Sequence, residues 1–200
     1  GPPWGPLQDF PAENPGVQVP ETDTVEGGRR DKCVLPTAMF ARQGFMFARP
    51  MPGKCAQHVA DAFDWMWDSL GPAAFRRLFP ALLKDNGTEF STPLAVETSP
   101  DDGAPRTKVF YTRPYTATDK SHVERNHEYI RRVVLKGESF DSLSQTQVDL
   151  MMSHVNGYAR ASLMDDDSHP CRTPYERFAF EYGEEIARRL GIVPVPPPGG

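Results

Sequence analysis

The stretch Lys84-Asp85-Asn86-Gly87-Thr88-Glu89-Phe90 directly follows the apolar run Phe79-Pro80-Ala81-Leu82-Leu83. A short apolar run that ends at a turn signal is typical of a buried strand, and Asn-Gly is such a signal. We therefore expect Asp85 at the tip of a strand, where its carboxylate can face a cleft. A plain hairpin turn is the alternative explanation of the Asp-Asn-Gly triplet.

The sequence before this stretch predicts a meander of three antiparallel strands, because segments with strand propensity alternate with tight turns such as Gly27–Asp31. The three predicted strands lie at residues 22–25, 33–40 and 45–49. Apolar residues at helical spacing then predict a helix over Cys55–Leu70, and a short helix near Ala73–Leu78 leads into the strand that ends at Asp85.

The sequence after this stretch alternates between helix and strand signals. It predicts a polar loop at residues 91–107, a strand at 108–112, and helices that begin near residue 120, at residue 144 and at residue 173. The first of these helices has a buried stripe of Val123, His127, Ile130 and Val134. Capping boxes start the second, at Ser144 and Gln147, and the third, at Thr173 and Glu176, which is expected to end near Leu190.

This order of elements is that of an RNase H-like fold: α/β, with helices flanking a mixed five-stranded sheet and extra C-terminal helices. Six prolines in residues 1–20 predict an N-terminal arm or linker. We place the catalytic core at residues 21–135, the C-terminal helical part of the same domain at 136–192, and a disordered tail at 193–200.

Three carboxylates are expected to meet in this fold: Asp23 in the first strand, Asp85 at the end of the fourth, and Glu124 in the first turn of the next helix. The first and fourth strands of an RNase H-like sheet are neighbours, and the helix start crosses above them. Magnesium prefers carboxylate oxygens, and two ions about 3.5–4 Å apart serve phosphoryl transfer. Each acid also has a simpler explanation, as an exposed strand residue, a hairpin turn or a helix-start acid.

The composition bounds the function further. Acidic residues outnumber basic ones, 27 to 22, so the net charge is −5 and we expect DNA to bind weakly or through metal ions. The three scattered cysteines predict reduced thiols and a cytoplasmic protein. We expect no membrane segment, because no apolar run approaches the roughly 18 residues that one requires.

Five segments of the chain resemble signatures of the IS-thirty-type bacterial insertion-sequence transposases, a DDE family with a retroviral-integrase-like catalytic core. The segments are Glu21–Gly27, Lys84–Phe90, Val123–Arg132, Leu135–Phe140 and Thr173–Phe178. The family's Glu-x-Asp-Thr-Val-x-Gly pattern is present in the first, and its Asn-His-Glu-x-Ile-Arg-Arg pattern in the third. The resemblance extends over residues 9–192, which is nearly the whole chain.

The resemblance implies a transposase catalytic domain that cleaves transposon ends and transfers the freed 3′-hydroxyl into target DNA. Asp23, Asp85 and Glu124 would hold two Mg²⁺ or Mn²⁺ ions, and the active complex in the bacterial cytoplasm would be a homo-oligomer. Lys84 departs from the family, which has threonine there, and residues 163–171 form an acidic replacement of a more basic connection. No helix-turn-helix pattern precedes the core, so we expect the catalytic domain alone.

Other residues near these acids are candidates for supporting roles. Basic residues predicted to contact DNA phosphates are Arg125, Arg131, Arg132 and Lys136, for which a solvated helix face is the alternative. We expect three further side chains to contact the metal ligands and orient them, namely Asn126, His127 and Glu89. Capping, core or surface roles are the alternatives. The segments Cys55-x-x-His58 and His169-Pro-Cys171 lack the doubled spacing of a structural zinc site.

Two other functions fit the same residues. A non-catalytic DNA-binding or assembly module derived from a transposase would not cleave DNA at all. A generic RNase H-like nuclease would cut DNA without joining ends.

Overall fold

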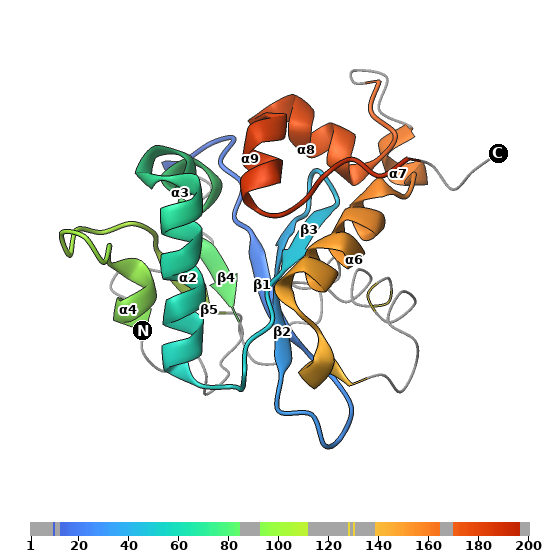
Figure 1. The fold of residues 1–200 in the computed structure, drawn as a ribbon. Helices are drawn as coiled ribbons and strands as arrows, with labels where there is room; N and C mark the ends of the chain where they lie inside the picture. Colours follow the sequence, from blue (N-terminus) through green and yellow to red (C-terminus); the bar gives the residue numbers. More distant parts are fainter. Residues whose placement is uncertain are drawn as a thin grey trace.

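A mixed sheet of five strands forms the centre of the computed structural model, which describes residue 10 and residues 13–84, 93–111, 128, 130, 139–164 and 170–196 (Figure 1). The strand order is β3-β2-β1-β4-β5. The strands are β1 (Glu21–Glu26), β2 (Val34–Phe40), β3 (Phe45–Ala48), β4 (Leu82–Lys84) and β5 (Val109–Tyr111). The predicted meander is confirmed, since β1 pairs with β2 and β2 with β3, both antiparallel.

The sheet becomes mixed at β1, which pairs in parallel with β4, and β4 pairs in parallel with β5. Glu21 lies opposite Leu83. The Thr22 hydroxyl donates a hydrogen bond of 3.1 Å to the Leu83 carbonyl, which ties the two strands together. The antiparallel pairing with β2 runs along the whole of β1, from Glu21 to Glu26, whereas β4 pairs with β1 only at Glu21.

Helices flank the sheet, as predicted. They are α2 (Ala56–Leu70), α3 (Pro72–Leu78), α4 (Pro93–Glu97), α6 (Gln145–Gly157), α7 (Ala161–Met164), α8 (Pro174–Tyr182) and α9 (Glu184–Arg189). In Figure 1, α2 lies over β4 and β5, whereas α6 and α8 lie beside β3 and pack against it. Both predicted capping boxes are present, at the starts of α6 and α8. Among the described residues, no helix is long and apolar enough to cross a membrane.

The C-terminal helices join the core of the meander through aromatic rings. Phe178 of α8 stacks on Phe45 with ring centroids 3.8 Å apart, and its edge meets Phe40 at 5.3 Å. All three side chains are fully buried, and each such burial contributes about 1.5–3 kcal/mol. The outer edge of β3 is covered by α6, where the Asn156 side chain accepts from the Met46 N–H and donates to the Met46 carbonyl.

Three predicted boundaries were wrong. The strand expected from Phe79 begins only at Leu82, because the Phe79 N–H still donates to the Phe75 carbonyl at the end of α3. The loop expected at residues 91–107 contains α4. The last helix is broken in two at Gly183, whose φ of 98° is accessible mainly to glycine.

The helix predicted over residues 120–134 is described only at Glu128 and Ile130. Both are helical; Glu128 is exposed and Ile130 is buried, as its place on the predicted apolar stripe requires.

Candidate active site

Asp23 lies in the middle of β1 and is half-buried. Its Oδ1 accepts a hydrogen bond of 2.8 Å from the Thr24 N–H, and its main-chain carbonyl accepts one of 3.3 Å from the Thr37 hydroxyl on β2. The carboxylate therefore projects from a strand position whose backbone is held by the antiparallel neighbour β2. Its position in the first strand of the sheet is the predicted one.

The second predicted carboxylate, Asp85, comes directly after strand β4 in the sequence. Lys84 is the last residue of β4, and Asp85 follows it in the sequence but lies outside the described residues. The Lys84 side chain is buried, and its ammonium lies 4.7 Å from the centre of the Phe63 ring on α2. A cation over an aromatic face is a favourable arrangement, which accounts for a lysine inside this layer.

The remaining predicted site residues also lie outside the described residues, so their roles stay predictions. They are Glu89, Glu124, Arg125, Asn126, His127, Arg131, Arg132 and Lys136. Within the described part of the chain, no three His, Cys, Asp or Glu side chains are close enough together to hold a metal ion. That part contains Asp23 but neither of the two other proposed ligands.

A small apolar cavity of about 40 Å³ separates the sheet from α2 beside Asp23. Its walls come from β1, β2, β3 and α2, and include Pro36, Phe47 and Phe63. A buried water needs about 10–15 Å³ by this kind of measure, so the space is too small for a metabolite-sized substrate.

Two aspartates that sequence reasoning missed fasten the β1–β2 turn to the chain at Ser139 and beyond. The Asp31 carboxylate accepts hydrogen bonds from the Ser139 hydroxyl at 2.7 Å, the Phe140 N–H at 2.9 Å and the Gly28 N–H at 2.8 Å. Asp141 Oδ1 accepts from the N–H groups of residues 32 and 33, at 2.8 and 2.6 Å. We call this set of contacts the aspartate clasp.

The clasp gives a structural explanation for three positions of the sequence motifs. A Cβ on Gly27 would lie 2.1 Å from Asp31 Oδ2 and 3.0 Å from the Phe140 ring, so a larger residue there would displace the Asp31 carboxylate from the clasp. Gly27 belongs to the first motif, and Ser139 and Phe140 to the fourth. The first and fourth motifs, which lie more than 100 residues apart in the sequence, are therefore in contact. In the sequence, only their match to the family patterns singled these positions out.

The clasp makes stability depend on pH. Hydrogen bonds from the Phe140 N–H and the Ser139 hydroxyl hold the pKa of Asp31 below its ordinary value. Ionised Asp31 therefore stabilises the fold above its unfolded-state pKa of about 3.9, and this contribution is lost as pH falls through the lower folded-state pKa. We expect Asp31→Asn to melt below wild type at pH 7, and the two melting temperatures to converge as the pH falls below about 4.

The control for this prediction is Asp68→Asn, which changes the net charge equally. Asp68 is exposed on α2, and its carboxylate accepts no hydrogen bond from the described residues. This variant should melt like wild type at both pH values. A constant difference between Asp31→Asn and wild type down to pH 2 would contradict the role given to the Asp31 charge.

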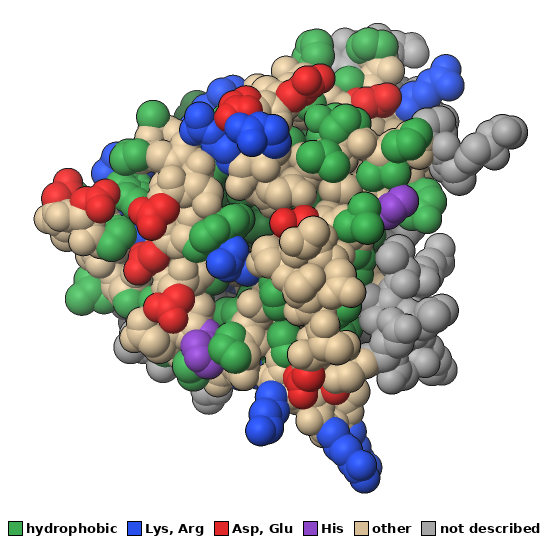
Figure 2. Space-filling view, viewed as in Figure 1, with side chains coloured by type: hydrophobic (Ala, Val, Ile, Leu, Met, Phe, Trp, Pro, Cys, Tyr) green, Lys and Arg blue, Asp and Glu red, His purple; other side chains and the backbone are tan. Residues whose placement is uncertain are grey.

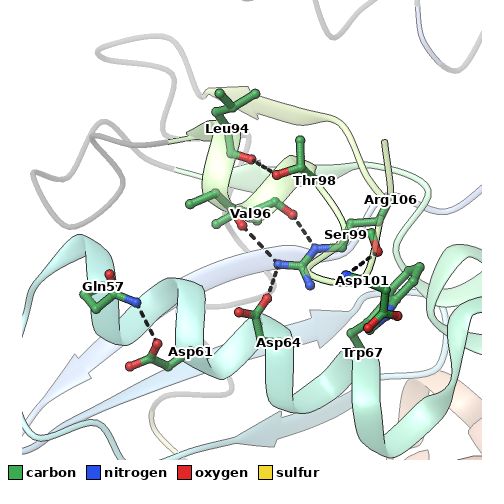
Figure 3. Close-up of polar contacts among 11 residues, drawn as sticks. Gln57, Asp61, Asp64, Trp67, Leu94, Val96, Thr98, Ser99, Asp101 and Arg106 are labelled. Atoms are coloured by element: carbon green, nitrogen blue, oxygen red, sulfur yellow. Dashed lines mark hydrogen bonds and ion pairs between the residues drawn. The ribbon is translucent and has the colours of Figure 1, made fainter. Parts of the chain in front are cut away.

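A second buried cation, Arg106, has a structural role (Figure 3). Its guanidinium donates to Asp64 Oδ1 on α2 at 2.7 Å and to the carbonyls of Val96 and Ala95 at 2.8 and 3.1 Å. The Arg106 side chain is fully buried, whereas that of Asp64 is 40% exposed. These contacts hold the segment around α4 against α2.

Comparison with known proteins supports the fold. No family model and no curated protein matches the chain. Among solved structures, the chain is similar to the catalytic core domain of BIV integrase, with a TM-score of 0.55 and 17% sequence identity. The match covers 83% of this chain and 96% of that one. At this identity the likeness shows the fold alone, and the predicted integrase-like RNase H fold is confirmed.

Proposed function

We propose that this chain is the catalytic domain of an insertion-sequence DDE transposase, which cleaves transposon ends and joins them to target DNA. The observation that carries the proposal is the parallel pairing of β1 with β4. Glu21 lies opposite Leu83, and Asp23 and Asp85 each follow two residues later in the sequence. Together with the motif match around Glu124, this register supports a cluster of three carboxylates in an integrase-like fold.

The donor set fits hard divalent cations. Asp23 offers carboxylate oxygens from a doubly paired strand, and Mg²⁺ and Mn²⁺ prefer such ligands. Asp23, Asp85 and Glu124 would hold two such ions, which when bound stabilise the attacking and leaving oxygens of phosphoryl transfer.

The chain's own contribution is positioning. The antiparallel pairing of Asp23 with Thr37 on β2 fixes the Asp23 backbone, and the Thr24 N–H donates a hydrogen bond that orients its carboxylate. Phosphates of the DNA would be bound by Arg125, Arg131, Arg132 and Lys136. The metal ligands would in turn be contacted and oriented by Asn126, His127 and Glu89. No side-chain nucleophile is assigned, because water and then the DNA 3′-hydroxyl attack.

The test is a strand-transfer assay with a duplex that carries a transposon end and a supercoiled target plasmid. We expect metal-dependent nicking at the end followed by joining to the plasmid, in full-length protein as a homo-oligomer. Nicking without joining would favour the generic nuclease. Binding without either reaction would favour the non-catalytic module.

Metal binding is expected to stabilise the fold. Clustered carboxylates repel each other when no cation is bound, and a ligand that binds only the folded state raises its stability. At a free metal concentration ten times the dissociation constant, the free energy of unfolding rises by about 1.4 kcal/mol, which raises the melting temperature by roughly 4 °C. Calorimetry with millimolar Mn²⁺ should show this increase in wild type and none in Asp85→Asn. An unchanged wild-type melting curve would count against the site.

A further inference from the structure

The turn between β1 and β2 presents basic side chains at its apex. The Asp31 N–H donates to the Gly28 carbonyl at 2.9 Å, so residues 28–31 close a turn whose two central positions are Arg29 and Arg30. Arg29, Arg30 and the following Lys32 are all exposed. We call these three residues the hairpin cations. Figure 2 shows Lys and Arg side chains projecting at the lower end of the molecule, where Figure 1 places this turn.

The acids near the hairpin cations are already engaged. Asp31 and Asp141 accept hydrogen bonds within the clasp, and Glu26 forms an ion pair with Lys54. By contrast, the structure gives the side chains of the hairpin cations no hydrogen bond or ion pair within the described residues. Three cations in four consecutive positions therefore face solvent on a chain whose net charge is −5.

The clasp also holds this turn in one conformation. Asp31 sits inside the turn and fastens it to Ser139 and Phe140, and Asp141 fastens the next two N–H groups. A turn fixed in this way presents its side chains from a defined point, so less backbone entropy is lost when it binds a ligand. A solvated loop would need neither the clasp nor a glycine at position 27.

We propose that the hairpin cations contact the phosphate backbone of DNA next to the active site. The inference rests on the proposed function, because it takes the DNA bound at Asp23 as the partner. Arg29 follows Asp23 by six residues, which span at most about 20 Å of extended chain. With the reach of the side chains added, the contacted phosphates lie within about one turn of the duplex from the reacting one.

The experiment measures duplex binding without metal, in EDTA, as a function of salt concentration. The test variant is Arg29→Gln with Arg30→Gln. Its matched control is Arg188→Gln with Arg189→Gln, which removes the same charge from α9 at the opposite end of the molecule (Figure 1). Each lost phosphate contact lowers the slope of log affinity against log salt by about one.

The test variant should therefore lose about two units of slope and bind more weakly, equally on two unrelated sequences because phosphate contacts carry no sequence information. The control should keep the wild-type slope, and thermal melting should show that both variants fold. Equal slopes for wild type and the test variant, or no DNA binding by wild type, would overturn the inference.

Metal-dependent cleavage by the same proteins separates this inference from the proposed function. If wild type cleaves and joins DNA while the test variant keeps the wild-type slope, only the hairpin contact is refuted. If wild type never cleaves but the test variant loses slope and the control does not, the contact is supported and the catalytic proposal fails.

Discussion

The Glu124→Gln variant is expected to lose at least about 10³-fold of metal-dependent strand transfer, a loss at the upper end of those seen when one catalytic electrostatic group is removed. The amide keeps the shape of the side chain but lacks the negative charge with which a carboxylate neutralises a divalent cation. Its effect on folding should be a few tenths of a kcal/mol, as for any helix-start acid. The measurement is single-turnover strand transfer in Mg²⁺ and in Mn²⁺ with the full-length protein.

Glu128→Gln is the matched control, since it makes the same chemical change one helical turn later. Glu128 is helical and exposed, so its replacement should leave most activity in place. Asp23→Asn should reproduce the loss of Glu124→Gln, and the double variant should be little worse than either, because residues that act as a unit are not additive. Equal losses at positions 124 and 128 would overturn the choice of the third carboxylate.

Local patterns predicted most of the fold. The helical spacing of Val59, Phe63 and Met66 located α2, and the two capping boxes located the starts of α6 and α8. These signals work because a cap or an apolar face involves residues within one or two turns of each other. The break at Gly183 was missed because a glycine inside a helical pattern is often tolerated. Only the packing of α9 decides whether the helix continues or breaks there.

The candidate site was predictable only in part. The position of Asp23 follows from strand order, and the structure shows its strand paired with β4. The clasp was not predictable, because Asp31 and Ser139 are separated by 108 positions and an Asp in a turn has many simpler explanations. Asp85 and Glu124 lie outside the described residues, so the sequence remains the evidence for them.

The contact between Arg106 and Asp64, which stabilises the fold, was also not predictable from the sequence. Arg106 lies in a segment that reads as a polar loop, yet its side chain is fully buried. Its partner Asp64 is on α2, where a charged residue between apolar positions normally faces solvent. Local sequence patterns give no sign that these two charges meet, whereas the fold joins them across the interface between α2 and the segment around α4.

Removing Asp64 is expected to produce a large loss of stability. Asp64→Ala takes the carboxylate from a buried guanidinium, and breaking such a pair costs about 3–5 kcal/mol. Because the Asp64 side chain is 40% exposed, we expect the lower end, about 3 kcal/mol, or roughly 6–12 °C in melting temperature. Urea denaturation and calorimetry of the purified domain measure both quantities.

The control lies one turn earlier on the same helix (Figure 3). Asp61 is exposed and accepts a hydrogen bond from Gln57, so Asp61→Ala should change stability by no more than about 0.5 kcal/mol. Both substitutions alter helix propensity equally, which leaves the Arg106 contact as the difference between them. Adding Arg106→Met to Asp64→Ala should restore part of the loss, because it removes the uncompensated buried charge. Equal stabilities of the Asp64→Ala and Asp61→Ala variants would show that solvent, rather than Asp64, compensates the charge of Arg106.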